Sequence, residues 1–369
     1  MKKIAFFDVY NPIPINSGGD WYRFQLLSDM GRDYEVTEYF TYELEGKTGY
    51  LPPAVPFNTR RIPSIIPWRK FSKILDMFKP EYLLSPGFGK EVHADIVFVS
   101  TVCYHFAKIV SIIRGVPIVL VMQNVEWQYL KGNGSSLYLP MRFYEHYIMK
   151  HVDAIIALSP RDYDYVKNNF PEKELFYIPP VVDTTIFRSD GPKYDFGEDK
   201  FNLLFYGSLD REQNIEGLKY IITSLIPALK QSGLMSNVRV NIFGSGIPPK
   251  ELMLEGNPDI NYLGQVENPD TYVRGADLVL VPLKNSGGMK IRLLESIACG
   301  KTVVATPEAK AGLPEGLGEY VHTATSTDEF ISTIEKMRAG GCTNMVDEGV
   351  VQKYLSGNSI ADVINYFRM

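Results

Sequence analysis

The sequence is poor in the residues that usually hold disulfide frameworks and metal sites. Its 369 residues include three cysteines, far apart in the chain, and five histidines without the spacing of a metal-ligand set. This excludes a disulfide-stapled fold and favours a reducing compartment. No run approaches the ~18 consecutive apolar residues of a membrane-spanning helix. The apolar stretch after Met1 is short and interrupted by Asp8, so it predicts a first strand and not a secretory signal.

An excess of charge of one sign is also missing. The 38 Lys and Arg residues nearly balance the 43 Asp and Glu residues, which leaves a net charge of −5. A nucleic-acid partner is therefore not expected, because such binding requires a basic surface. The sequence contains no Walker A loop, Gly-x-Gly-x-x-Gly turn or Gly-x-Ser-x-Gly elbow, so nucleotide hydrolysis, ordinary NAD binding and serine hydrolysis lose support.

What is present is a globular chain, 45% hydrophobic, with length for two domains. In the first half, short Val/Ile/Phe-rich runs alternate with helical patterns. The runs are continuous, as is typical of strands covered on both faces. We expect strands at 4–9, 34–39, 95–100, 117–122, 154–158 and 175–178, with helices at 19–30, 106–114, 141–149 and 160–168.

A proline-containing segment at 178–192 predicts a domain boundary, after which the alternation restarts. The order predicts an α/β chain with two Rossmann-like, doubly wound domains facing across a cleft. Their predicted bounds are 1–187 and 188–350, with 351–369 as a C-terminal helix that packs back on the first domain. In the second half we expect strands at 202–206, 238–243, 260–263, 278–281 and 302–306, and helices at 214–229, 289–299, 327–338 and 359–368.

The strongest functional signal is a strand, a glycine turn and a helix between 278 and 299. Gly287 and Gly288 allow the backbone to approach a ligand, and the start of the helix favours an anion. Lys290 and Arg292 add two cations where the helix dipole alone would favour acids, which a bound diphosphate would explain. Glu295, one turn further, is suited to accept hydrogen bonds from a ribose diol. The alternative is a solvated Arg292–Glu295 pair on an exposed helix.

Four collinear segments of the second half resemble the donor-binding half of retaining glycosyltransferases of family 4, which have the GT-B fold. The order and spacing match over residues 201–313. The first half resembles the family more loosely. The segments are 207–210 with 214–216, 242–246, 263–266 and 288–306, and in the first half Gly18, Gly19, Arg23, 123–126, Ser159 and 179–187.

The resemblance implies a nucleoside-diphosphate-sugar donor, linked to UDP or GDP. It implies that Glu295 binds the ribose, that Lys290 and Arg292 bind the diphosphate, and that the backbone near Val266 binds the base. Gly18 and Gly19 would face the phosphates from the first domain. The other implied donor-site residues are Gly207, Ser208, Gly244, Gly246, Gly287, Gly288, Met289 and Ile291.

The sequence departs from the family pattern at two positions. Many members carry an acidic residue eight positions before the ribose-binding glutamate, where this chain has Gly287. Many also carry a histidine at about the position of Gln123. Both departures concern the residues that contact the sugar, and Gln123 joins Lys290 and Arg292 as a catalytic candidate.

The resemblance also implies how the reaction proceeds. Retaining enzymes of this type react on one face of the anomeric carbon, and the leaving diphosphate helps to deprotonate the acceptor. If Lys290 and Arg292 neutralise that leaving group, neither a metal nor a cofactor is needed. A metal-dependent alternative has one candidate, Asp162 with Asp164. They follow Ser159 and Pro160, so helix capping explains them better.

A basic, aromatic segment spans residues 60–79. Trp68, Arg69, Lys70 and Lys73 lie where apolar residues begin to recur every three or four positions, which predicts an amphipathic helix. Such a helix can lie on an anionic membrane or meet a lipid-linked acceptor. It can equally pack its apolar face on the first domain, with its cations in solvent.

We therefore expect a cytoplasmic, metal-independent retaining glycosyltransferase of hexosyltransferase type, with any membrane contact peripheral and at the inner face. Its acceptor would be a hydroxyl of a glycan or a lipid-linked precursor, in surface polysaccharide or glycoconjugate synthesis. A non-catalytic nucleotide-sugar-binding subunit is the alternative, motivated by Gly287 and Gln123. A sugar-nucleotide epimerase is disfavoured, because the paired acids and histidines that it needs cannot be placed.

Overall fold

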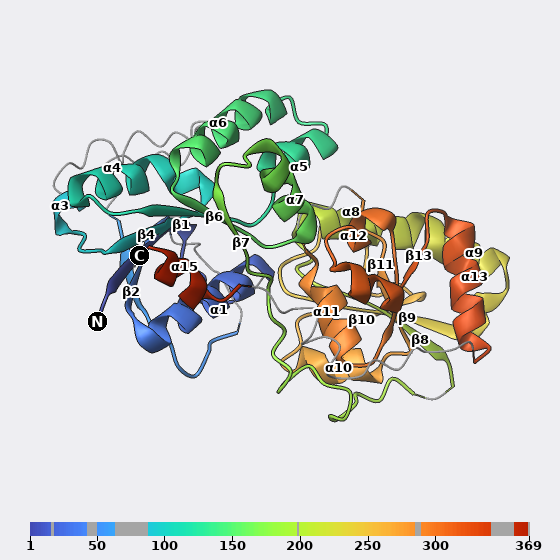
Figure 1. Cartoon of the computed structure of the whole chain (residues 1–369). Coiled ribbons are helices and arrows are strands. Elements are labelled where there is room, and N and C mark those ends of the chain that lie inside the picture. Colours follow the sequence, from blue (N-terminus) through green and yellow to red (C-terminus); the bar gives the residue numbers. More distant parts are fainter. Residues whose placement is uncertain are drawn as a thin grey trace. The chain divides into compact units, whose positions relative to one another are not determined.

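The chain forms two compact units, one of which is built from two separate segments. Met1–Pro179 and Gly357–Met369 make the first unit, and Pro180–Ser356 makes the second (Figure 1). The computed structural model describes residues 1–15, 18–42, 50–62, 88–197, 199–284, 289–340 and 358–367. The segment with Trp68, Arg69, Lys70 and Lys73 and the pair Gly287 and Gly288 lie outside these residues.

The first unit is built on a seven-stranded parallel sheet. The strand order β3-β2-β1-β4-β5-β6-β7 reverses direction between β1 and β4. The central strands are continuous apolar runs that are buried along their length, as strands covered by helices on both faces require. The strands are β1 (Lys3–Tyr10), β2 (Glu35–Tyr42), β3 (Asn58–Arg61), β4 (Ile96–Val99), β5 (Ile118–Met122), β6 (Ala154–Ala157) and β7 (Glu174–Tyr177).

Helices cover both faces of this sheet and enclose two apolar cores. One core contains Phe106 and Ile148 from the helices that follow β4 and β5. The other contains Leu27 from the helix after β1. The helices are α1 (Gly18–Asp33), α3 (Phe88–Glu91), the 3₁₀ turn η2 (Thr101–Cys103), α4 (Tyr104–Arg114), α5 (Glu126–Gly132), α6 (Tyr138–His151), α7 (Pro160–Asn169) and α15 (Ile360–Tyr366).

The helix α15 belongs to the first unit although it follows the second in sequence. Ser359 begins it with a capping box, in which its side chain and that of Asp362 each accept from the other's backbone N–H. Val363 and Ile364 are fully buried in the same core as Ile4. Residues 358–367 therefore complete the apolar core on this face of the sheet.

The second unit has a six-stranded parallel sheet in the order β10-β9-β8-β11-β12-β13. Its strands are β8 (Phe201–Tyr206), β9 (Val238–Phe243), β10 (Ile260–Tyr262), β11 (Leu278–Val281), β12 (Thr302–Ala305) and β13 (Val321–Thr323). Its helical segments are α8 (Glu212–Tyr220), η3 (Ile221–Leu225), α9 (Ile226–Gln231), η4 (Leu234–Ser236), η5 (Lys250–Leu252), α10 (Pro269–Gly275), α11 (Ile291–Ala298), α12 (Pro307–Lys310), η6 (Glu315–Tyr320) and α13 (Thr327–Arg338).

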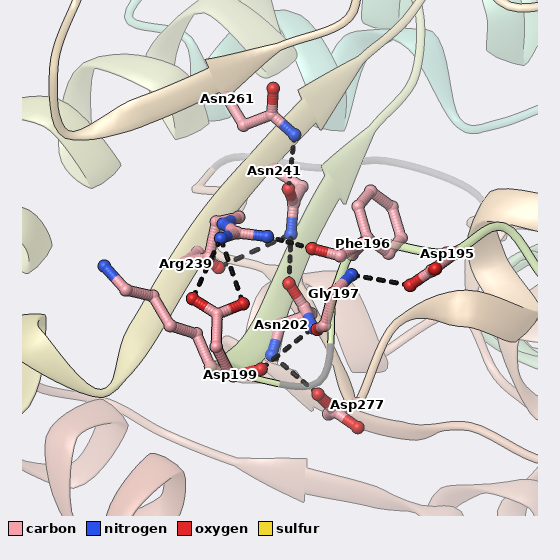
Figure 2. A network of polar contacts seen from close by, with 10 residues as sticks. Asp195, Phe196, Gly197, Asp199, Asn202, Arg239, Asn241, Asn261 and Asp277 are labelled. Carbon is pink, nitrogen blue, oxygen red and sulfur yellow. Dashed lines mark hydrogen bonds and ion pairs between the residues drawn. The ribbon is translucent and has the colours of Figure 1, made fainter.

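Three asparagines fix the register of neighbouring strands in this sheet (Figure 2). The Asn261 amide donates to Asn241 Oδ1 over 2.9 Å, and the Asn241 amide donates to Asn202 Oδ1 over 3.3 Å. The backbone N–H of Asn202 also donates a hydrogen bond to Asp277 Oδ2 over 2.6 Å. These hydrogen bonds satisfy the buried amides of Asn202 and Asn241 and link β8, β9 and β10 side by side.

The predicted fold class is confirmed, and every predicted strand lies on an observed one. The first segment of the first unit ends at Pro179, whereas the sequence predicted the domain boundary at 187. The helix expected at 214–229 is interrupted by a π-helical turn at Ile221–Leu225, just before Pro227, which has no N–H to give. None of the described helices combines the length and the apolar character that crossing a bilayer requires.

Candidate functional site

The site predicted in the second unit lies where its strand order reverses. From β8 the chain proceeds outward through β9 and β10, then returns to the other side of β8 with β11. Because the chain continues from β8 to one side of the sheet and from β11 to the other, this is the topological switch point of the unit. Doubly wound folds bind ligands at the carboxyl edge of the sheet at such a point. Gly207 follows β8, and Arg292 and Glu295 lie on α11 beyond β11.

Arg292 is held by contacts on three sides. Its Nη2 donates to Asn214 Oδ1 over 2.8 Å, and the Asn214 amide in turn donates to the carbonyl of Ser208 over 2.7 Å. Its guanidinium lies 5.5 Å from the ring centre of Phe205 and 5.9 Å from that of Tyr206. These contacts leave the guanidinium little freedom to turn.

One nitrogen of this guanidinium lacks a hydrogen-bond acceptor among the described residues. Arg292 Nη1 is buried and has no hydrogen-bond partner among the described residues. A buried donor without an acceptor costs about 1–3 kcal/mol, and more when it is charged. Gly207 makes room for the group, because a Cβ on Gly207 would lie 2.2 Å from Arg292 Nη2. The guanidinium is thus closely packed, with one donor that the described residues leave unsatisfied.

Glu295 meets the hydroxyl of Tyr206. Tyr206 Oη lies 3.1 Å from Glu295 Oε2, 3.0 Å from the carbonyl of Arg292 and 3.2 Å from Ser296 Oγ. Because a phenol has a single proton, it can donate to only one of these acceptors at a time. Ser296 already donates to the Arg292 carbonyl over 2.7 Å, so Glu295 is the acceptor most in need of that proton.

Burial controls the ionisation of this cluster. It raises the pKa of Glu295 to about 7, against which the Tyr206 hydrogen bond and the charge of Arg292 both act. Burial also lowers the pKa of Arg292 and raises that of Tyr206, whose ionisation the Glu295 charge opposes further. The Glu295 carboxyl therefore changes charge near neutral pH.

Lys290 precedes α11 and is its N-cap, so the helix begins at Ile291 and not at 289 as the sequence predicted. Its Nζ donates to Gln213 Oε1 over 3.2 Å, beside the Asn214 that holds Arg292. Both cations of the predicted motif thus point to the start of α8. Met289 packs against the apolar core. Ile291, the first residue of the helix, is partly buried.

The remaining predicted donor-site residues of this unit form the neighbouring loops. Ser208 and Ser245 place their hydroxyls 3.3 Å apart, and the Gly244 N–H donates to the Gly264 carbonyl over 2.9 Å. A Cβ on Gly244 would lie 1.8 Å from the Gly207 carbonyl oxygen, and one on Gly246 would meet Asp210 at 2.5 Å. The glycines let the tips of β8 and β9 touch. Val266 packs against the core just beyond this contact.

The predicted residues of the first unit lie at the carboxyl ends of its own strands. Gly18 and Gly19 are exposed at the start of α1, and Gln123 is exposed after β5. Arg23 instead serves the fold. It is buried and pairs with Asp8, Asp20 and Glu38.

The candidate Asp162 caps a helix. Ser159 Oγ accepts from the Asp162 N–H over 3.1 Å and donates to Asp162 Oδ2 over 2.6 Å, which confirms the capping interpretation. Among the described residues, His, Cys, Asp and Glu side chains nowhere gather in threes as a metal site would require.

Sequence analysis missed two residues that shape this site. Tyr206 was assigned only to a strand, and Asn214 only to a predicted helix and a matching segment, because their partners lie 89 and 78 positions away in the chain. The one available signal was a phenol at the last position of a buried strand, where its hydroxyl needs a polar partner.

Comparisons with known proteins identify the family of this chain. Residues 200–339 match the family described as glycosyl transferases group 1, and residues 29–186 match glycosyltransferase family 4. An uncharacterized glycosyltransferase from Methanosarcina acetivorans is 25% identical over 289 residues, which span 74% of this chain and 66% of that protein.

Solved structures show the same fold. Sucrose-phosphate synthase from Thermosynechococcus elongatus superposes with a TM-score of 0.75 at 16% identity, over 100% of this chain and 98% of the other. HepE from Anabaena, solved in complex with UDP-glucose, gives a TM-score of 0.65 at 15% identity, over 96% of each chain. The two parallel sheets and these superpositions show that the chain has the GT-B fold. The chain belongs to the family 4, or group 1, glycosyltransferases.

Proposed function

We propose that this glycosyltransferase transfers a sugar, with retention, from a UDP- or GDP-linked donor to a hydroxyl acceptor. The observation that carries the donor assignment is the buried, unpartnered Nη1 of Arg292 at the switch point of the second sheet. A diphosphate oxygen would supply the missing acceptor as a charge-assisted hydrogen bond. The UDP-glucose in the HepE structure, which has the same fold, supports a nucleotide sugar as the ligand class.

The neighbouring side chains suit the rest of such a donor. Lys290 precedes the same helix and can reach a second phosphate oxygen, while Glu295, one turn along, suits the ribose hydroxyls. The loop with Val266 offers backbone groups to the base. During transfer, the two cations would stabilise the charge that develops on the leaving diphosphate, and no metal would be needed.

The acceptor side is proposed for the first unit. Gly18 and Gly19 would approach the phosphates, and Gln123 would contact the transferred sugar or the acceptor from the end of β5. We propose a glycan or lipid-linked acceptor, met in the cytoplasm or at the inner face of a membrane, as in surface polysaccharide or glycoconjugate synthesis.

Calorimetric titration with UDP, GDP and their common sugars tests the donor site. Arg292→Ala and Lys290→Ala should each weaken diphosphate binding by roughly 10- to 150-fold, the value of a charge-assisted contact. Lys219→Ala, an exposed cation on the neighbouring helix α8, is the matched control and should bind normally. Unchanged affinity in both site variants would remove the diphosphate from this loop.

A non-catalytic nucleotide-sugar-binding subunit is the second candidate. Its motivation is the exposed Gln123, which cannot transfer a proton as an imidazole does. Release of free sugar from the donor by the purified chain, and its loss in Arg292→Ala, would establish the enzyme. Tight donor binding without any turnover, with or without added acceptor glycans, would favour the binding subunit.

A further inference from the structure

The outer face of α6 carries apolar side chains that are exposed in the part of the chain that the structure describes. Leu139, Phe143 and Tyr147 recur every four residues and therefore lie along one side of the helix. Their exposed fractions are 46%, 74% and 47%. The opposite side, with Met141 and Ile148, is buried in the first unit's core. Tyr147 also contacts the rings of Tyr104 and His105 on α4, with centroids 6.1 and 6.4 Å apart, so part of its ring belongs to the packing of the unit.

Only cations flank the stripe on this helix. Arg142 and Lys150 are exposed beside it, and the single acid of α6, Glu145, is turned inward and buried. There Glu145 accepts the backbone N–H groups of Glu126 and Trp127, over 2.9 and 2.8 Å. The outer face of α6 is thus apolar and basic, without an exposed carboxylate.

The neighbouring helix α4 extends the same character. Lys108 reaches across from α4 to the carbonyl of His151 at the end of α6, with a hydrogen bond of 3.0 Å. Ile112, one turn further along α4, is 70% exposed. The sequence of α4 contains no acid. We call the surface formed by Lys108, Ile112, Leu139, Arg142, Phe143, Tyr147 and Lys150 the α4–α6 face.

We propose that the α4–α6 face lies on an anionic phospholipid surface. Aromatic and aliphatic side chains would enter the headgroup region while Arg142 and Lys150 meet phosphate groups beside them. A second copy fits less well, because a two-fold contact through Phe143 would bring the same cations of both copies together. The inference deepens the proposed membrane location but does not depend on the donor site.

Vesicle flotation tests the proposal with the full chain. We would compare phosphatidylcholine vesicles with and without phosphatidylglycerol, for wild type and two double variants. Arg142→Glu with Lys150→Glu should lower binding at least about thirtyfold, since each cation near an anionic surface adds about 1 kcal/mol. Phe143→Ser with Tyr147→Ser should lower it at least about tenfold. High salt should release the wild type.

Matched controls separate vesicle binding through the α4–α6 face from changes in stability or in donor binding. Ile247→Ser removes an apolar residue of the second unit that is even more exposed, at 84%, and should not change flotation. All variants should keep the wild-type melting temperature and UDP affinity, so failure of the donor proposal would be seen independently.

Several outcomes would overturn the proposal. These are absence of wild-type binding to anionic vesicles at low salt, and equal flotation of wild type and both double variants. A concentration-dependent dimer that Phe143→Ser abolishes would assign the face to a second copy. A large fall in melting temperature in the serine variants would show that another part of the chain covers the stripe.

Discussion

Asn214 Oδ1 accepts a hydrogen bond from Arg292 Nη2 over 2.8 Å, and so links the start of α8 to the start of α11. Asn214 is itself buried and anchored through its amide to the Ser208 carbonyl. The guanidinium is therefore held in one orientation, which would lower the entropic cost of the anion binding proposed above.

Removing this anchor should weaken donor binding without removing a donor contact. We expect Asn214→Ala to raise the UDP dissociation constant roughly 5- to 30-fold, equivalent to about 1–2 kcal/mol. The double-mutant cycle is decisive: in an Arg292→Ala background, Asn214→Ala should have little further effect. Additive losses in calorimetric titration would mean that Asn214 acts on the ligand by another route.

The hydroxyl of Tyr206 should set the pH at which the nucleotide binds best. The carboxylate form of Glu295 can accept both ribose hydroxyls, so UDP affinity should rise as Glu295 ionises around its pKa of about 7. In Tyr206→Phe the donor to Glu295 is lost, its pKa rises further, and the midpoint of the affinity profile should move to higher pH.

The control for this profile is Glu295→Gln. UDP phosphate groups titrate near pH 6 as well, and that contribution should persist in the glutamine variant. Only the difference between the pH profiles of UDP affinity for wild type and Glu295→Gln reports the ionisation of Glu295. If wild type and Glu295→Gln gave parallel profiles between pH 5.5 and about 9, the ribose assignment would fail.

The same carboxyl should make stability depend on pH. Burial raises the pKa of Glu295 from 4.5 to about 7. Below pH 4.5 it is neutral in both the folded and the unfolded chain. Between these values only the unfolded chain ionises, so the free energy of unfolding falls as the pH rises to about 7.

The glutamine side chain of Glu295→Gln is uncharged at every pH, so this variant should not show the fall in the free energy of unfolding. Its stability relative to wild type should therefore grow by about 1–3 kcal/mol between pH 5 and pH 8. Denaturant unfolding at several pH values measures the difference. A constant difference across that range would show that Glu295 ionises normally.

Packing of the last helix should be essential to the first unit. Ile364 is fully buried in a core with Ile4 and Tyr22. Ile364→Ala should lower the free energy of unfolding by about 2–5 kcal/mol, whereas its exposed neighbour Asn365→Ala should stay within about 0.5 kcal/mol. Urea denaturation, followed by intrinsic fluorescence, compares the two. Equal, small effects would place α15 outside the cooperative unit.

The sequence predicted the strands that are buried on both faces, because those are continuous apolar runs. It missed β3, whose residues Asn58–Arg61 are all exposed at the sheet edge and carry no apolar pattern. It also missed the three-residue β13 and the short helices α5, α10 and α12, which are too brief to show a helical period.

The candidate site was predictable as a motif but not as an arrangement. Arg292 and Glu295 were suggested by unusual charges near a glycine turn, and such local chemistry is visible in a sequence. The Asn214 side chain comes from helix α8 and the Tyr206 hydroxyl from strand β8. The raised pKa of Glu295 follows from burial. These depend on tertiary packing, which the spacing of residues in one segment does not encode.

The return of the chain to its first unit has a consequence for biosynthesis. A ribosome makes residues 1–179 first, yet Val363 and Ile364, which close one core of that unit, follow the whole second unit. At about 5–20 residues per second, roughly ten to forty seconds separate the two segments. The continuous second unit can fold during that interval. The apolar surface around Ile4 remains exposed until α15 is synthesised, and chaperones can bind it during that time.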